Sequence, residues 1–416
     1  MSWPEVVFES VFAAPSRNGV YKSKEHHGSG VPIVNMGELF AFDRIGEQAT
    51  SLLQMTDAEL EKSGLIDGDL LFGRRSLVEE GAGKCSMVYR PSRLMTFESS
   101  IIRVRLDKTV ADPEFFFNYF RSPIGRSRVR AIVGGAAVKG IRGSDLKLIK
   151  VHLPPINEQI AIRQVVSAYD DLIATNQRRI TLLEDAARRL YREWFVQFRF
   201  PGHESVLLLD GVPQGWQSGS AFDFVSIMSG GTPKTGMEHF WGGEIPFFTP
   251  KDSPDAFYVL GTEKTLTESG LASCNSRLFP KDTVFITARG TVGKIALAQK
   301  PMAMNQSCYA LAPKQDYDNR FLFLAIQEAV DHFKQVATGG VFNAIIVDTF
   351  KIIPFLMPDI WLTRVFGDKV QPIFQQIENL LLQNQNLARA RDLLLPKLMS
   401  GQLDVSGIPL PDEVAA

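Results

Sequence analysis

Residues 157–198 read NEQIAIRQVVSAYDDLIATNQRRITLLEDAARRLYREWFVQF, and their apolar positions recur in alternating steps of four and three. Such spacing puts one stripe of side chains on a single helix face and is typical of a coiled-coil seam. The seam consists of Ile162, Val166, Tyr169, Ile173, Asn176, Ile180, Leu183, Ala187, Leu190 and Trp194. The stretch therefore predicts one helix of roughly 40 residues, about 60 Å long.

A second seam has the same register 204 residues later. It consists of Phe366, Val370, Ile373, Ile377, Leu380, Asn384, Leu387, Arg391, Leu394 and Leu398. Pro154-Pro155 and Pro358 precede the two stretches, as expected where a new helix begins. Pro372 and Pro396 lie inside the second stretch, so we expect a break or kink near each of them.

Two such helices in one chain are expected to pair with each other. If a two-fold axis relates the halves, the pairing is antiparallel and the numbers of facing residues sum to 560, so Asn176 faces Asn384. Two amides that satisfy each other would fix the register at some cost in stability; alternatively, each lies at a hydrated helix edge. The predicted core of the pair is Ile173, Asn176, Ile180, Leu183, Ile377, Leu380, Asn384 and Leu387.

The segments that precede the helices also match each other. Collinear matches at shifts of 204–214 residues include Gly19–Lys22 with Gly231–Lys234, Asp69–Phe72 with Asp282–Phe285, Gly83-Lys84 with Gly293-Lys294, and Gly134-Gly135 with Gly339-Gly340. Short apolar runs interrupted by Gly, Pro and Asn predict strands and turns there. We therefore expect an α+β fold with an internal pseudo-two-fold repeat. Two mixed α/β domains (1–152 and 201–356) are separated by two long antiparallel helices in a coiled coil (153–200 and 357–405), and a tail follows (406–416).

Length and composition limit the class of protein. The chain has 416 residues, enough for two or three domains, and a net charge of -1, which argues against one electrostatic clamp formed by the whole chain. The three cysteines form no motif, so we expect a reducing cytoplasm; no signal peptide or membrane span is expected. Residues 121–150 hold eight basic residues against Asp145 alone, which fits either a phosphate-facing surface or a solvated helix face.

Motifs of catalysis are missing from the sequence. It contains no DPPY-like tetrad of an aminomethyltransferase and no Glu-x-Lys nuclease pattern. The glycines before Lys84 and Lys294 do not have P-loop spacing, and neither lysine is followed by Ser or Thr. The histidines are scattered, so we expect no metal site.

The loops instead carry side chains that can read base edges. Arg and Lys suit guanine, and Asn and Gln suit adenine. Each of these residues could also be an ordinary polar group of a loop. The candidates for DNA binding are Lys22, Asn35, Arg74, Arg75, Lys84, Ser99, Arg128, Lys139, Arg142, Lys234, Thr249, Lys251, Asp252, Arg289, Thr291, Lys294, Asn305, Gln306 and Asn343.

Several longer motifs point to one family. They are Leu153-Pro-Pro-Ile-Asn-Glu-Gln159, Leu190-Tyr-Arg-Glu-Trp-Phe195, Gly230-Gly-Thr-Pro-Lys234, Trp241-Gly-Gly-Glu-Ile-Pro246, Asn305-Gln-Ser307 and Leu395-Pro-Lys-Leu-Met-Ser-Gly401. Over nearly its whole length the chain resembles the specificity subunits of type I restriction-modification systems. The first half departs from the pattern, with Tyr21 in place of Pro233 and Met36-Gly-Glu38 in place of Pro250-Lys-Asp252.

The resemblance implies a non-catalytic reader of double-stranded DNA. Each domain would dock in the major groove at one half of a split, asymmetric target, with the helices as a ruler for the spacer. The expected partners are two methyltransferase subunits, which bind S-adenosylmethionine, and ATP-dependent restriction subunits, which use Mg; no cofactor is expected in this chain. A coiled-coil scaffold for protein interactions, without sequence-specific DNA contact, is the alternative.

Overall fold

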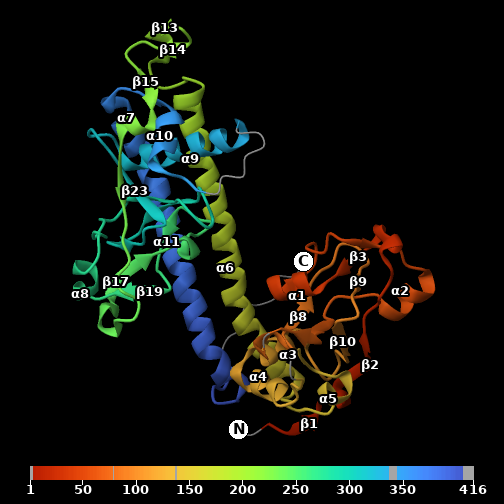
Figure 1. The fold of residues 1–416 in the computed structure, drawn as a ribbon. Coiled ribbons are helices and arrows are strands. Elements are labelled where there is room, and N and C mark those ends of the chain that lie inside the picture. The colour runs from red at the N-terminus through yellow and green to blue at the C-terminus, as the bar shows by residue number, and fades with distance from the viewer. Residues whose placement is uncertain (1–2, 78, 136–137, 337–343, 406–416) are drawn as a thin grey trace. The chain divides into compact units, whose positions relative to one another are not determined.

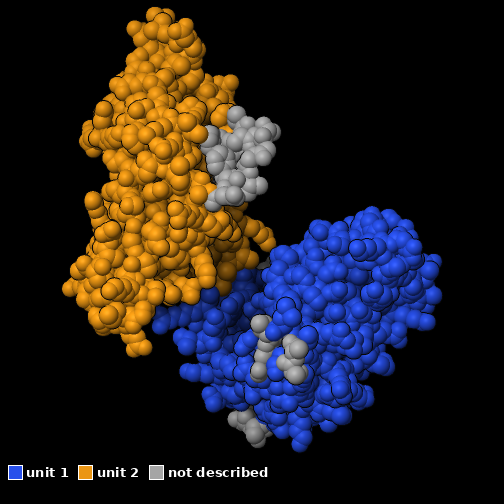
Figure 2. All heavy atoms as spheres, viewed as in Figure 1, with its two compact units in different colours: residues 1–171, 387–416 blue, residues 172–386 orange. Residues whose placement is uncertain are grey.

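The computed structural model describes residues 3–77, 79–135, 138–336 and 344–405. The chain divides into two compact units, unit 1 (1–171 with 387–416) and unit 2 (172–386), which Figure 2 colours separately. Each unit therefore combines one mixed α/β domain with a segment of both long helices. The tail expected at 406–416 lies outside the described residues. No helix in the described part of the chain is long and apolar enough to cross a membrane.

Unit 1 is built on a five-stranded sheet with a smaller sheet beside it. The five-stranded sheet has the order β2 (Phe12–Asn18), β10 (Ile101–Leu106), β6 (Leu70–Gly73), β8 (Cys85–Val88) and β4 (Arg44–Ile45), and the β4–β8 pair is parallel. The smaller sheet has the order β5 (Leu52–Leu53), β3 (His27–Val34) and β9 (Thr96–Phe97). Two further pairs are β1 (Glu5–Val7) with β12 (Lys150–His152) and β7 (Arg75–Ser76) with β11 (Lys139–Gly140). The helices are α1 (Met36–Ala41), α2 (Asp57–Ser63), α3 (Pro113–Arg121), α4 (Pro123–Arg130) and α5 (Gly143–Leu146).

Unit 2 repeats the two sheets of unit 1 and its β1–β12 pair, while the β7–β11 pair has no counterpart among the described strands of unit 2. Its five-stranded sheet has the order β16 (Val225–Ser229), β23 (Cys308–Pro313), β20 (Val284–Thr287), β21 (Ile295–Ala298) and β18 (Tyr258–Val259), and the last pair is again parallel. The smaller sheet has the order β19 (Lys264–Leu266), β17 (Trp241–Phe248) and β22 (Ala303–Met304), and β15 (Gln217–Ser220) pairs with β24 (Pro354–Met357). A hairpin of β13 (Leu208–Leu209) and β14 (Val212–Pro213) has no counterpart among the described strands of unit 1. The helices are α7 (Ala221–Phe224), α8 (Glu268–Ala272), α9 (Asn319–Val336) and α10 (Val347–Ile352).

The repeat extends to single hydrogen bonds. Gly83 N donates to Gly73 O over 2.7 Å, and Gly293 N donates to Thr287 O over 2.8 Å at the same place in unit 2. Both glycines have positive φ, 68° and 76°, a conformation that side chains with a Cβ rarely adopt. The two Gly-Lys dipeptides are thus matching turns at the start of β8 and β21, and the internal repeat that the sequence predicts is confirmed.

An aromatic cluster forms the core of unit 1 around α3. Asp112 caps this helix by accepting a hydrogen bond from Phe115 N, and Pro113 occupies its first turn. Phe115, Phe116, Phe117, Tyr119 and Phe120 are fully buried beneath the sheet and against the start of the first long helix. Packing of this density fixes the domain on that helix.

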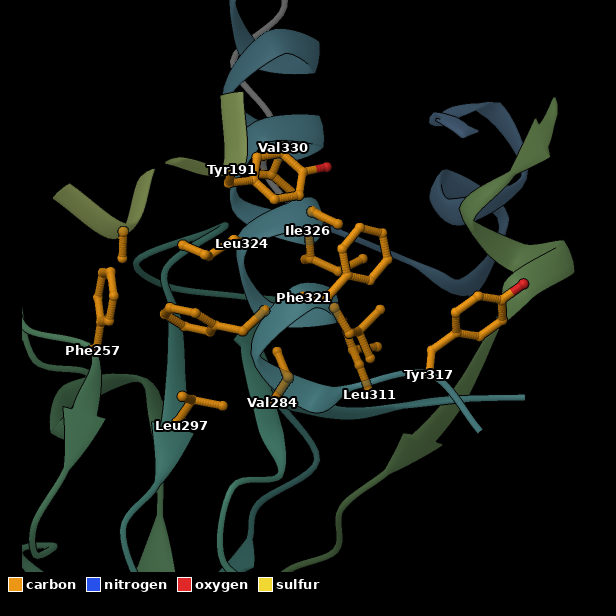
Figure 3. Packing of buried hydrophobic residues seen from close by; sticks show 14 of the residues in the cluster. Tyr191, Phe257, Val284, Leu297, Leu311, Tyr317, Phe321, Leu324, Ile326 and Val330 are labelled. Carbon is orange, nitrogen blue, oxygen red and sulfur yellow. The ribbon is translucent and has the colours of Figure 1, made fainter. Parts of the chain in front are cut away.

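The core of unit 2 lies between α9, the sheet and the long helices. Figure 3 shows Phe321, Leu324 and Ile326 of α9 over Val284, Leu297 and Leu311 of the strands. The Glu184 carboxylate reaches from the first long helix into this core, where it accepts a hydrogen bond from Phe257 N over 2.8 Å. Burial raises the pKa of Glu184 above its ordinary value.

The two long helices are α6 (Ile156–Tyr191) and α11 (Ile360–Met399), drawn in yellow-green and blue in Figure 1. A π-helical turn, Arg192–Val196, continues α6, so the helix expected over 157–198 is present. The helix has no break at Pro372 or Pro396, because α11 runs through both residues. Pro372 is exposed, so the carbonyl that it leaves without a partner can be hydrated, while buried Val370 and Phe374 hold the helix to the core.

The long helices pair antiparallel, in the predicted register. Asn176 Nδ2 donates to Asn384 Oδ1 over 3.0 Å, and Asn384 Nδ2 donates to Ile173 O over 3.3 Å. Within unit 2 the Tyr191 and Phe366 rings lie 6.2 Å apart; within unit 1 Arg391 Nη1 lies 2.6 Å from Asp170 Oδ1. Contacts in both units therefore follow one antiparallel register.

The asparagine pair should be visible in a double-mutant cycle. Asn176→Leu or Asn384→Leu alone leaves a partner amide without its hydrogen bond and should lower the free energy of unfolding by about 1–3 kcal/mol. The double leucine variant should recover this loss, because no amide is then left unpaired. Denaturant unfolding of the four proteins measures the coupling. Additive single effects would show that the pair does not set the register.

Candidate nucleic-acid interface

Unit 1 has an open surface cavity of about 400 Å³ lined by basic side chains. Arg74, Arg75, Lys139 and Arg142 line it together with the backbone of Gly134, Gly135 and Gly140; Asp145 is the acidic residue in the lining. Among the described residues none of the four cations forms an ion pair, and Arg75 and Arg142 are exposed. The arrangement is therefore a cluster of free positive charge that is open to a polyanion.

Backbone pairing brings these cations together from distant parts of the sequence. Strand β7 pairs antiparallel with β11, so that Arg75 lies opposite Gly140, and Ile141 N donates to Arg74 O over 3.0 Å. Gly140 and Gly134 exchange two backbone hydrogen bonds of 2.9 Å. The glycine-rich loop is thus tied to the end of β6, and Arg74 is further held by a hydrogen bond of 3.5 Å to Ser99 O.

The other candidates of unit 1 already have partners. Lys22 Nζ lies 2.7 Å from Glu59 Oε2, and this bond is the main reason that the pKa of Glu59 falls to about 2. Arg128 pairs with Glu5, and Lys84 donates to Phe40 O over 2.7 Å. Because these side chains already bind groups of the protein, they are less available to bind a negatively charged ligand.

Two polar candidates of unit 1 make local structural contacts. Asn35 is the N-cap of α1, with Glu38 completing the capping box. Ser99 contributes its carbonyl to Arg74. Neither residue lines the basic cavity, so a base-reading role for either residue stays a prediction.

Unit 2 has a cavity of about 490 Å³ around the ends of β17 and β22. It brings together six of the candidates, which are Thr249, Lys251, Asp252, Arg289, Asn305 and Gln306. Thr291, Lys294 and Lys234 do not line it: Thr291 Oγ1 bonds Pro250 O, Lys294 pairs with Asp255 over 2.6 Å, and Lys234 is exposed. Asn343 lies outside the described residues. Most of the residues expected to read DNA in this unit therefore share one cavity.

Asp252, the predicted DNA-binding carboxylate of this cavity, stabilises the local backbone. Asp252 Oδ2 accepts from Thr249 N and Oγ1 over 2.8 and 2.6 Å, which closes a capping box around Pro250–Asp252. Asp252 Oδ1 accepts from Glu263 N over 2.7 Å. Both oxygens of Asp252 therefore already accept hydrogen bonds, and the Thr249 hydroxyl donates its hydrogen to Asp252.

The cations of the cavity remain free. Lys251 and Arg289 are exposed, and no described residue forms an ion pair with either. Arg289 corresponds to Arg75 of unit 1, because Ile345 N donates to Ala288 O over 2.8 Å just as Ile141 N donates to Arg74 O. A free arginine thus occupies the same position in both units.

Trp241 and Phe247 form an aromatic wall in this cavity, and neither is among the residues that the sequence predicts to bind DNA. Trp241 packs edge-on against Phe247, and Lys264 Nζ lies 5.5 Å from the centre of the Trp241 ring. Trp241 begins the Trp241–Pro246 motif on which the family resemblance partly rests. It is the first residue of β17, which pairs with β19, and Lys264 is the first residue of β19. Thr232, Thr235, Glu263 and Ser307 complete the polar lining.

The described residues offer no group of three or more His, Cys, Asp or Glu that could hold a metal ion. Cys85 and Cys308 are buried and burial raises the pKa of both thiols, so neither is set up as a nucleophile. The cavities present cations, amides and hydroxyls, which is chemistry for binding.

Comparison with known proteins gives these surfaces a family context. A model of the type I restriction modification DNA specificity domain matches residues 3–185 and 213–382. The chain is 21% identical to the specificity subunit of the type I restriction enzyme HindI of Haemophilus influenzae, over 82% of this chain and 88% of that protein. It is 22% identical to the putative MjaX specificity subunit of Methanocaldococcus jannaschii, over 94% of this chain and 91% of that one.

A solved structure has the same fold. The S subunit of a type I restriction-modification system from M. genitalium superposes with a TM-score of 0.58 at 17% identity, over 96% of each chain. Two matched domains, one in each half, cover most of the sequence. The chain therefore belongs to the family of type I restriction-modification DNA specificity proteins.

Proposed function

We propose that this chain is the non-catalytic specificity subunit of a type I restriction-modification complex. In this proposal each unit recognises one half of a split, asymmetric DNA target. The observation that carries the proposal is the pair of cavities, one in each unit: both present free cations, with Arg75 and Arg289 at matching positions, and the cavity of unit 2 adds amides. Arginine and amide side chains are the groups that read base edges in the major groove.

The two cavities differ, which supports an asymmetric target. The lining of the unit 1 cavity has four basic residues against Asp145, whereas unit 2 offers amides, threonines and an indole beside its cations. Residues 201–355 hold 12 basic and 15 acidic residues. We infer that partner subunits supply part of the grip on the phosphates, because a domain of this charge binds DNA weakly by itself.

The partners follow from the same proposal. Two methyltransferase subunits would bring S-adenosylmethionine and transfer its methyl group to adenine, and restriction subunits would use ATP and Mg. The antiparallel helix pair would set the spacer between the half-sites. The three cysteines are free thiols, which supports a reducing compartment such as the cytoplasm. A protein scaffold without DNA contact would not need free cations at matching positions of both units.

A domain exchange tests the proposal. Replacing residues 201–356 by the equivalent domain of another family member should change one half of the methylated target and leave the other half unchanged. Mapping of methylated adenines in cells that carry the chain and its partner subunits measures both halves. The reciprocal exchange of residues 1–152 is the control. If either exchange alters both halves, the two units do not read independently.

A further inference from the structure

The orientation of one amide in the unit 2 cavity is fixed by the backbone. Ser307 N donates a hydrogen bond of 3.0 Å to Asn305 Oδ1. Only the oxygen of an amide can accept from an N–H group, so the side chain cannot be turned the other way. The Asn305 amide therefore keeps its oxygen on its own loop. Its NH₂ group has no partner among the described residues.

The neighbours of Asn305 are donors as well. Gln306 Oε1 accepts from the Thr232 hydroxyl, which leaves the Gln306 NH₂ group free. The loop of Arg289 adjoins Asn305, because Ala288 N and Arg289 N both donate to Ser307 O, over 2.8 and 3.3 Å. The NH groups of Asn305, Gln306 and Arg289, which can only donate, therefore lie in one lining beside hydroxyls that can donate or accept. The exposed Glu263 carboxylate is an acceptor in the lining of the same cavity.

This pattern distinguishes the two purines. Bidentate recognition of adenine by Asn needs the amide oxygen for N6 and the amide nitrogen for N7. Guanine presents two acceptors, O6 and N7, on its major-groove edge and is matched by donors alone. We propose, resting on the proposed function, that Asn305 and Arg289 make unit 2 select a guanine at one position of its half-site.

Unit 1 has a different group at the matching position. Asn305 N donates to Phe248 O over 3.0 Å, and Glu98 N donates to Val34 O over 3.0 Å, so Glu98 occupies the place of Asn305. One Glu98 oxygen accepts from Met36 N over 2.6 Å. A carboxylate can only accept hydrogen bonds, so the donor that we assign to unit 2 is missing at this position of unit 1. The part of the guanine preference that depends on Asn305 should therefore be confined to the half-site of unit 2.

Asn305→Asp is the matched test. The aspartate can keep the hydrogen bond from Ser307 N, so the loop should fold as before, but it replaces the outward NH₂ group by an acceptor. For the assembled complex on a panel of duplexes with all four base pairs at each half-site position, we expect the preference for one G·C pair to fall by about 10- to 100-fold. The other positions should keep their ranking. Asn319→Asp makes the same change at the start of α9, where the residue lines another cavity, and should leave every preference intact.

The outcomes separate this proposal from the proposed function. If wild-type protein and its partners show no sequence-specific binding, the proposed function fails. If binding is specific but the unit 2 half-site holds only A·T pairs, the guanine assignment alone is overturned. It is also overturned if Asn305→Asp leaves every preference unchanged or weakens all base pairs equally. The guanine assignment is supported if Asn305→Asp removes the preference for one G·C pair, and if that pair lies in the half-site that changes when residues 201–356 are exchanged.

Discussion

Replacing Arg74, Arg75, Lys139 and Arg142 by glutamine should produce the largest loss of DNA affinity that a few substitutions in this chain can cause. These four cations line one cavity and form no ion pair among the described residues. Each phosphate neutralised contributes about −0.9 to the slope of log affinity against log salt. Four such contacts account for roughly a 100-fold change in affinity between 50 and 200 mM salt. The variant should lose most of that dependence.

The measurement is a salt titration of duplex binding by the assembled complex, with wild-type and variant chains compared on one target. A charge-matched control neutralises four cations of unit 1 that do not line the cavity, namely Lys24, Lys62, Arg93 and Lys150. Equal salt slopes for the two variants would show that the cavity is not the phosphate contact. If instead the cavity variant keeps its slope but relaxes the preference at single base pairs, these arginines read bases.

Much of the fold follows from patterns that survive in a single sequence. The step of four and three places Asn176 opposite Asn384 once the helices are taken as antiparallel, because the seam fixes the face and the repeat fixes the register. The collinear glycine motifs mark turns that need positive φ, as Gly83 and Gly293 have. The effect of Pro372 on the helix could not be predicted from the sequence pattern. A helix tolerates a proline on its solvent-exposed side, and the structure is needed to show that Pro372 lies on that side.

The candidate site could be predicted only in part. Residue type identified Arg74, Arg75 and Arg289, but it could not tell that Arg128 is paired with Glu5. The two residues of that pair are 123 positions apart in the sequence, so no local sequence pattern predicts their contact. The same limit hid the occupied oxygens of Asp252, whose partners come from two loops. A list of side chains therefore gives the chemistry available, and tertiary hydrogen bonds decide which groups are still free.

The helix pair offers the second large effect, on the spacing of the target. Inserting one heptad into each helix, between residues 172 and 173 of α6 and between 387 and 388 of α11, should lengthen the spacer of the methylated target by about three base pairs. These points face each other in the observed register and lie within one residue of the boundary between the units, so each unit keeps its own contacts. Seven residues add about 10 Å of helix, which is the length of about three base pairs of duplex.

The register explains why both insertions are needed. A heptad in α6 alone preserves its seam but shifts the part of α6 in unit 1 by two turns relative to α11, so the Asn176–Asn384 contact of unit 2 and the Asp170–Arg391 contact of unit 1 can no longer form together. That single insertion should therefore lower the stability of the chain without giving a defined new spacer. Mapping of methylated adenines reads the spacer directly in cells with the partner subunits. If the double insertion leaves the spacer unchanged while both half-sites are still methylated, the helices do not act as the ruler and the spacing is set by the partner subunits.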